Sequence, residues 1–383
     1  MRSRTHSRRA LASGAFALVA SVASLASHAD AQVRVDTIAS ERESRIAPQG
    51  LAEGATPGLA DDGTVAFWGS TANSPNSIFV GDGTAVWPID VGASGLSRPR
   101  SIKLNGDALV FVADAPSARG VYAVDRAGGP IAPVHVIGGP GKLPAINDVA
   151  LSTNGTLAFA TVCSDCGRGG GAVLTGTRFG ALTELQRGTA GGGAFLYNSQ
   201  YVDINDRGQV AVQAEYLPEY KRAIFVLQRA GDPIANVDTA VDGLGSGSQP
   251  RPALNNRGEV AYVLDRTQVI IATPSRFGTP KAARIIADAS GPYASFGRVD
   301  LDDRGNVVFE ATLDDGRKGI FSGPDAAAHK VALEGEPVGG LPIVTLHAMG
   351  QLNNQSQLAL VAAVQAATDT RVLRITGLPA TPR

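Results

Sequence analysis

Apolar residues recur along this chain in short triplets, and each triplet follows a turn rich in Asx residues and glycine. The clearest copies are Asn205–Val212, Asn255–Tyr262 and Asp302–Phe309, where an Asx-x-x-Gly turn leads into a run such as Val260-Ala261-Tyr262. In such a turn the Asx side chain bonds to the backbone two residues on, and glycine takes a positive φ without steric cost. The pattern therefore predicts a β-hairpin at each copy.

The same unit occurs seven times, at intervals of about 50 residues. The four other copies begin at Asp61, Asn105, Thr153 and Asn353. In each triplet a small residue lies between two larger apolar ones with no polar alternation, which is typical of a strand buried on both faces. A short strand before each turn and two strands after each triplet bring the unit to four. We therefore expect an all-β fold, a seven-bladed β-propeller of four-stranded antiparallel blades.

The two ends of the chain complement each other. The seventh copy has no fourth strand of its own, whereas the segment Val33–Ile38 precedes the first copy. Within this region Asp36-Thr37-Ile38-Ala39 is similar to the fourth-strand segment Arg284-Ile285-Ile286-Ala287. An open ring would leave sheet edges free to pair with other chains. We predict that the N-terminal strand closes the last blade of a single domain over residues 32–383; the alternative is an open row of seven repeats.

The first 31 residues have the pattern of an export signal. Four arginines precede an apolar stretch, and Ala29-Asp30-Ala31 offers the small residues that signal peptidase requires. The stretch is shorter than the roughly 20 residues that cross a bilayer. We expect a signal peptide at residues 1–31, no membrane span after its cleavage, and a secreted or periplasmic protein. The arginine pair leaves both the general and the twin-arginine export routes open.

The composition of the chain limits the classes of partner that we expect it to bind. The formal net charge is −1 and no basic tract follows the N-terminal signal, so a nucleic-acid partner is not expected. The 46 glycines exceed average usage, which suits a chain that turns often.

Only two cysteines occur, Cys163 and Cys166. Outside the cytoplasm this spacing favours a local disulfide. A redox site would require a helix N-terminus beside the thiolate, and a zinc site would require two further ligands. Both remain weaker alternatives because no helical pattern follows and the histidines are far apart in sequence.

The run Asn-x-x-Gly-x-Val-Ala-Phe, best seen at Asn205–Val212 and Asn255–Tyr262, resembles the NxxGxxAF tandem-repeat family of exported bacterial proteins. The resemblance covers nearly all of the mature chain and implies a propeller-like fold, but it brings no catalytic or ligand-binding residues. The sequence departs from the repeat at Ala60, Ser152 and Ser356. We expect copies one, three and seven to turn differently there.

Clustered Asx oxygens could bind Ca²⁺, and the best candidates for such a site are Asp61-Asp62 and Asp302-Asp303. Each turn already uses its Asx side chain locally, and the alternating acidic residues of a calcium loop are missing. We therefore expect structural turns and no cofactor, with Ca²⁺ as the alternative.

Loops that join the second and third strands share one end of the propeller with the linkers between blades. Tyrosines beside charges on such loops can contact sugars or peptides. The candidate ligand face comprises Tyr216, Glu219, Tyr220, Arg222, Arg168, Asp265, Arg266, Asp315 and Arg317. The alternative is a set of ordinary solvated loops.

No nucleophile elbow, phosphate loop or metalloprotease helix is found in the sequence, and His135, His329 and His347 fall in predicted strands. We expect a monomeric, non-enzymatic binding or scaffold protein whose partner is an extracellular or periplasmic protein or glycan. The alternatives are a propeller-type lyase or hydrolase with a divalent metal at the central channel, and a surface adhesin. Three or more carboxylates, histidines or amides converging on the channel would favour the enzyme, and apolar or solitary polar groups would favour the scaffold.

Overall fold

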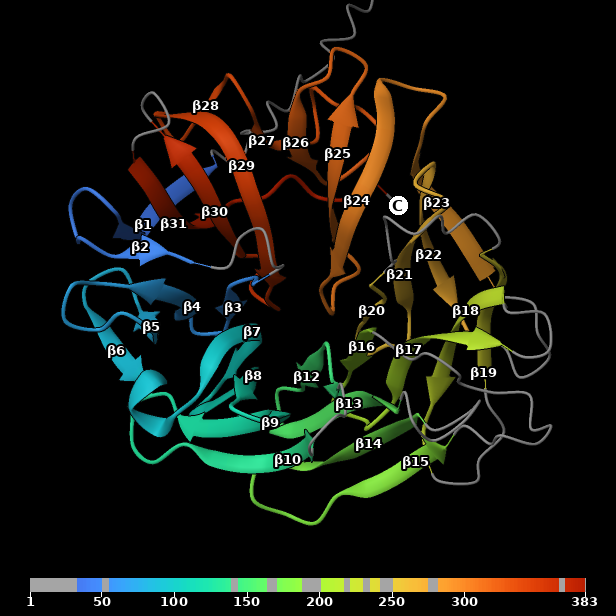
Figure 1. Ribbon diagram of the computed structural model, residues 1–383. Helices are drawn as coiled ribbons and strands as arrows, with labels where there is room; N and C mark the ends of the chain where they lie inside the picture. The colour runs from blue at the N-terminus through green and yellow to red at the C-terminus, as the bar shows by residue number, and fades with distance from the viewer. Residues whose placement is uncertain are drawn as a thin grey trace, which may run out of the picture. The chain divides into compact units, whose positions relative to one another are not determined.

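The protein forms a ring of seven antiparallel sheets around a central channel (Figure 1). The computed structural model describes residues 33–49, 55–138, 144–163, 171–187, 201–216, 221–229, 235–241, 251–274, 282–364 and 369–382, all within the compact unit Val33–Arg383. Over these ranges the only helical segment is the single turn η2 (Gly92–Ser94), and no helix in them could span a membrane. The seven-bladed β-propeller is thereby confirmed.

Each blade has four main strands, which run from the channel outward. The innermost strands are β3 (Gly58–Leu59), β7 (Ser97–Asn105), β12 (Val149–Leu151), β16 (Tyr201–Ile204), β20 (Ala253–Leu254), β24 (Tyr293–Leu301) and β29 (Leu341–Leu352). The second strands are β4 (Val65–Ser70), β8 (Ala108–Ala115), β13 (Thr156–Cys163), β17 (Val210–Tyr216), β21 (Val260–Leu264), β25 (Val307–Leu313) and β30 (Leu358–Val364). The third strands are β5 (Ser77–Gly81), β9 (Ala118–Asp125), β14 (Ala172–Thr177), β18 (Lys221–Leu227), β22 (Gln268–Thr273), β26 (Lys318–Phe321) and β31 (Asp369–Thr376).

The outermost strands are β6 (Val86–Asp90), β10 (Ala132–Gly138), β15 (Thr183–Arg187), β19 (Ala235–Val241), β23 (Ala282–Asp288), β27 (Lys330–Leu333) and β1 (Arg34–Ser40). Three two-residue strands extend this plan. They are β2 (Ala47–Pro48), which pairs with β4, β11 (Pro144–Ala145), which pairs with β13, and β28 (Pro337–Val338), which pairs with the start of β29.

The triplets form the second strand of every blade, and their side chains are buried on both faces of the sheet. Val65, Ala66 and Phe67 of β4 are almost fully buried, and every residue of β30 is buried. The apolar clusters lie between neighbouring blades; one of them packs Tyr293 and Phe309 of the sixth blade against residues of the fifth. The small central residue of each triplet lets the adjacent sheets approach closely.

The N-terminal strand closes the ring, as predicted. β1 pairs antiparallel with β31 from Arg34 opposite Thr376 to Ser40 opposite Arg371, with a bulge near Thr37. The side chain of Asp369 is fully buried beside this junction. Its carboxylate accepts hydrogen bonds from the Ser40 hydroxyl at 2.7 Å, from the Arg42 backbone N–H at 3.1 Å and from Arg371 Nε at 2.7 Å. A sheet ladder and one buried carboxylate therefore hold the two ends of the chain together.

The turns that precede the triplets are more uniform than the sequence predicts. At Ala60, Ser152 and Asn353 the backbone makes the same two hydrogen bonds as at Asn205, so the expectation of different turns in copies one, three and seven is wrong. Ser356 replaces the turn glycine yet adopts a φ of 54°, because its hydroxyl donates to Asp302 Oδ2 at 2.7 Å and helps to hold it there. The copy that differs is the second, where Asn105 pairs directly with Ala108 in a tighter hairpin.

Two predictions fall outside these observations. The signal peptide at residues 1–31 lies outside the described residues. So does Cys166, and for Cys163 only the backbone at the end of β13 is described. The disulfide therefore stays a prediction.

Replacing Asp369 with alanine should destabilise the ring, because it removes the buried carboxylate that Arg371 Nε contacts at 2.7 Å and releases Ser40 and Arg42; Arg371 then keeps only the exposed carboxylate of Glu43. Breaking a buried ion pair of this kind costs about 3 kcal/mol. Urea unfolding of the full chain measures the loss. The matched control is Asp315→Ala, which breaks an Asp-x-Arg pair with Arg317 of the same 2.7 Å geometry on the surface. Equal effects in the two variants would contradict a closing role for Asp369.

Candidate functional site at the channel mouth

Hydrogen bonds between neighbouring turns encircle one end of the channel. The side-chain amide of Asn205 donates to the carbonyl of Asn255 at 3.0 Å, Asn255 donates likewise to Asp302 at 3.2 Å, and Asn353 donates to Ala60 at 2.8 Å. The next position in each turn adds a second set of contacts. The backbone N–H groups of Asp206, Asn256, Asp303 and Asn354 each donate to the Asx side chain of the following blade, over 2.7 to 3.0 Å. The Asx residues thus join blades as well as shaping turns.

A further set of interblade contacts lies deeper in the channel. Asp203 Oδ2 accepts from the Leu254 N–H at 2.7 Å, and Asp300 Oδ2 accepts from the Leu352 N–H at 2.8 Å. The other oxygen of each carboxylate accepts from the next residue of its own strand. Asp148 makes a longer contact of the same kind with Val202, at 3.4 Å. These carboxylates satisfy N–H groups at the inner edge of the adjoining blade.

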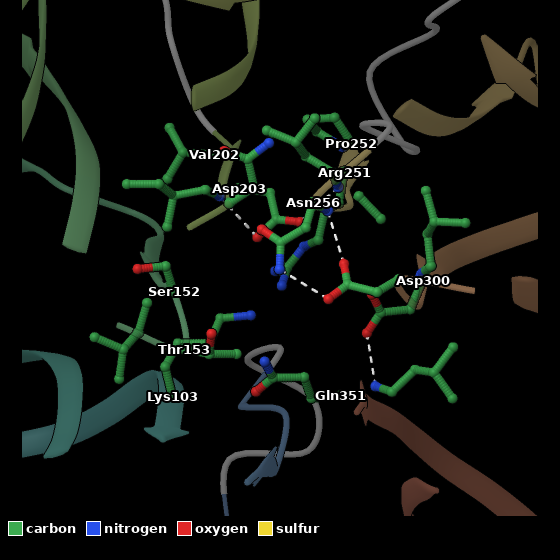
Figure 2. A pocket seen from close by; sticks show the side chains of 18 of the residues that line it. Lys103, Ser152, Thr153, Val202, Asp203, Arg251, Pro252, Asn256, Asp300 and Gln351 are labelled. Carbon is green, nitrogen blue, oxygen red and sulfur yellow. Dashed lines mark hydrogen bonds between the residues drawn. The ribbon is translucent and has the colours of Figure 1, made fainter. Parts of the chain in front are cut away.

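A cavity of about 100 Å³ lies within the rings of contacts and opens between the Asx turns. Figure 2 shows Lys103, Asp203, Arg251, Asp300 and Gln351 arranged around it, each from a different part of the ring. Asp203, Asp300, Gln351 and Lys103 occupy one register, two residues before the first residue of their turns. Arg251 and Arg298 lie two residues further from the mouth. Alternate residues of the inner strands therefore face the cavity.

The cationic groups of the cavity have few partners. Within the described part of the chain, Lys103, Arg251 and Arg298 make no side-chain hydrogen bond or ion pair, and Arg298 Nη1 is a buried nitrogen without a partner. Arg251 lies over the ring of Tyr201, with its guanidinium carbon 4.4 Å from the ring centroid. The charges around the cavity are thus held close to one another without being paired.

Enclosure within the ring shifts the protonation of these groups. Burial raises the pKa of Asp203 to about 7, although the nearby charge of Lys103 opposes the shift. Burial also raises the pKa of Asp300, against the opposing charge of Arg298. For Arg298, burial and the neighbouring charge of Arg251 lower the pKa of the guanidinium. A buried carboxyl group with a pKa near neutrality beside unpaired cations is typical of a functional site.

The channel meets the criterion that the sequence analysis set for the enzyme, but the hydrogen bonds of its carboxylates complicate that interpretation. Three carboxylates and an amide converge on it, which counts toward the enzyme. However, the carboxylate oxygens already accept backbone N–H groups, and no group of three metal-ligating side chains is present among the described residues. The Asp302-Asp303 and Asp61-Asp62 pairs that suggested calcium are also engaged, since Asp302 Oδ1 accepts two N–H groups of its own turn and Asp61 and Asp303 bind the preceding blades.

The described residues of the candidate ligand face lie at the other end of the ring, because the strands alternate in direction. Asp265 and Arg266 form the turn between β21 and β22, both with positive φ. Asp315 pairs with Arg317, which also reaches Glu336 Oε1 at 3.0 Å, so these two side chains fix a loop. For Tyr216 and Arg222 only the backbone is described, and the residues Arg168, Glu219 and Tyr220 lie outside the described part.

The three histidines lie in different surroundings. His135 in β10 packs against Phe159, with ring centroids 5.3 Å apart, and burial lowers its pKa. Burial also lowers the pKa of His347 in β29. The strand position predicted for His329 is wrong, since it lies in the turn before β27, where the chain reverses after Asp325.

Replacing Asp203 with asparagine should change how stability depends on pH. A pKa raised from 3.8 to about 7 in the folded state means that ionising Asp203 opposes folding, so this group lowers the stability of the native protein as the pH rises through that window. The asparagine side chain of the variant does not ionise. The variant should therefore gain about 2 to 3 kcal/mol relative to the native protein between pH 5 and pH 8. Denaturant unfolding at several pH values measures the difference.

The matched control for this experiment is Asp315→Asn, because hydrogen bonds from Arg317 lower the pKa of Asp315 and it titrates below the window. Its stability difference from the native protein should stay flat between pH 5 and pH 8. A flat difference for the Asp203 variant as well would contradict the raised pKa.

Comparison with known proteins shows the fold alone. No protein-family model and no curated protein matches the chain. Among solved structures, a chain from a structural analysis of two prolyl endopeptidases has 13% sequence identity to this chain and a TM-score of 0.53. The alignment covers 85% of this chain and 50% of the other. A chain of the mitotic checkpoint complex has 12% identity and a TM-score of 0.51 over 98% of this chain and 99% of its own. Prolyl oligopeptidase B from Galerina marginata has 11% identity and a TM-score of 0.51, over 81% of this chain and 46% of its own. The chain thus spans about half the length of the two peptidases and is similar to them in its β-propeller.

Proposed function

We propose that this protein is an exported, monomeric, non-enzymatic binding protein that takes its ligand into the channel from the end formed by the Asx turns. The observation that supports the proposal is the cavity of about 100 Å³, which is enclosed by the ring of blades and lined by charged side chains. Small-ligand sites are concave and carry a few convergent polar groups. The cavity suits a small molecule, or one terminal group of a larger glycan or protein partner.

The hydrogen bonds of the acidic residues favour binding over catalysis. A general base must come within hydrogen-bond reach of the proton that it abstracts. Asp203 and Asp300 instead use their carboxylates to hold Leu254 and Leu352 of the adjoining blades. Moving either carboxylate toward a substrate would break a contact between blades. The lyase or hydrolase with a divalent metal in the channel is the competing proposal, and the same experiment tests both.

The full mature chain should be screened by thermal shift against small acids, sugars, peptides and divalent metals, with each ligand analysed after incubation. We expect saturable stabilisation by at least one small ligand, which is recovered unchanged. Stoichiometric calcium in the purified protein, or turnover that Asp203→Asn abolishes and Asp315→Asn does not, would support the enzyme instead. If no member of the panel shifts the melting temperature, the result would contradict a ligand in the channel.

We further propose export and assignment to the NxxGxxAF repeat family. The shared backbone hydrogen bonds of six of the seven turns support the family, because they give one physical reason for the Asx-x-x-Gly pattern. Export predicts that the protein isolated from its native host begins at Gln32 and is absent from the cytoplasm. N-terminal sequencing of the fractionated protein measures this, and an intact Met1 in the cytoplasmic fraction would contradict it.

A further inference from the structure

The cations of the channel cavity have no protein group to balance them directly. Lys103 comes from β7, Arg251 from the segment before β20 and Arg298 from β24, so three separate blades direct a positive charge at one space. An unpaired buried charge is costly, and removing water from a guanidinium is favourable only when an anion or an acceptor replaces it. Arg298 Nη1 is buried without such an acceptor among the described residues.

The neighbouring carboxylates do not fill this role. Asp203 and Asp300 are turned toward the backbone of the adjoining blades. Glu310, in β25 behind Arg298, accepts from the backbone N–H groups of Met349 at 3.1 Å and of Arg298 itself at 3.3 Å. The acidic groups therefore stay at fixed positions around the cations, with no ion pair closer than 4 Å between Lys103, Arg251 or Arg298 and any described carboxylate.

Arg251 is held at the cavity by an aromatic ring. Its guanidinium carbon lies 4.4 Å from the centroid of the Tyr201 ring, and its side chain makes no hydrogen bond to the described residues. A fixed guanidinium fork matches the two oxygens of a carboxylate, sulfate or phosphate group. A lysine nearby adds a mobile donor.

We propose that the channel cavity binds a small oxyanion group, a carboxylate or a sulfate or phosphate ester, through Lys103, Arg251 and Arg298. This inference rests on the proposed binding function and specifies the class of its ligand. The cavity of about 100 Å³ would take a small acid, or one acidic end of a larger molecule inserted between the Asx turns.

The site should bind anions more tightly as the pH falls. The charged groups that line the cavity are Lys103, Asp148, Asp203, Asp206, Arg251, Arg298, Asp300 and Asp303, with Glu310 behind Arg298. Because the raised pKa of Asp203 is about 7, protonation near neutrality removes one negative charge while the cations keep theirs. Lowering the pH through this value makes the net charge around the cavity less negative, which favours binding of an anion.

The test uses the full mature chain with acetate, succinate, phosphate and sulfate as probes, titrated by calorimetry against a chloride background of equal ionic strength. Acetate and succinate stand for the carboxylate source, and sulfate and phosphate for the ester source. We expect at least one probe to bind in a one-to-one complex, and its affinity to rise several-fold from pH 8 to pH 6. Sulfate and acetate keep their charge over this range, so the change belongs to the protein.

Two variants locate the site. Lys103→Met and Arg251→Met should each weaken binding of the same probe at least tenfold. The Lys103 variant removes no hydrogen bond or ion pair of the described residues, although it removes a charge that stabilises ionised Asp203 and Asp300. The matched control is Arg317→Met at the opposite end of the ring, which should bind as the native protein does.

Each other outcome has a defined meaning. Equal binding by all variants would place the anions on the outer surface and overturn the inference. Binding of a neutral sugar or a cation in the channel, without binding of any oxyanion, would also overturn it but leave the proposed binding function in place. No binding by any probe or by any member of the wider panel would contradict both.

Discussion

The structure depends on how seven sheet edges are satisfied where they meet. Every blade ends at the channel with a strand that has no further neighbour, and backbone N–H groups enclosed there must still find acceptors. The strands β3 and β20 are only two residues long, which limits the number of exposed groups. Side chains of the preceding blade accept some of these groups, as Asp203 does for Leu254 and Asp300 for Leu352. Hydrogen bonds from side chains to backbone thus join adjoining blades at the channel, in addition to the apolar clusters between the sheets.

This requirement explains what the sequence could and could not show. Turns and triplets are local features, so Asn255-Asn256-Arg257-Gly258 and Val260-Ala261-Tyr262 predict a hairpin on their own. The closure by β1 was predictable because a missing strand at one end matched a surplus strand at the other. The turn at Ser356 was not, because its positive φ depends on a hydrogen bond to Asp302 in another blade, 54 residues away. Tertiary contacts overrode the local preference for glycine.

The cavity was not predicted from the sequence, and the reason is related. Tyr201-Val202-Asp203-Ile204 and Arg298-Val299-Asp300-Leu301 do alternate polar and apolar residues, which is the signal of a strand with one solvated face. Four residues are too few for that period to stand out, and in other blades the same register holds Ala150, Ala253 or Gly58. Aligning the seven copies on their turns and reading only the position of Asp203 would have brought Lys103, Asp203, Asp300 and Gln351 together. The loops at the other end carry more conspicuous charges, but there Asp315 and Arg317 pair with each other.

The pairing of β1 with β31 has a consequence for the biogenesis of the protein. Ser40 and Asp369 are separated by 329 positions in the sequence, so the contact that seals the ring has nearly the largest contact order that this chain allows. If the polypeptide emerges from a translocon with its N-terminus first, the first strand to emerge must wait for the last before it can be incorporated. Until then it is an unpaired amphipathic segment, and the nascent ring stays open to chaperones and proteases for as long as synthesis and transport continue.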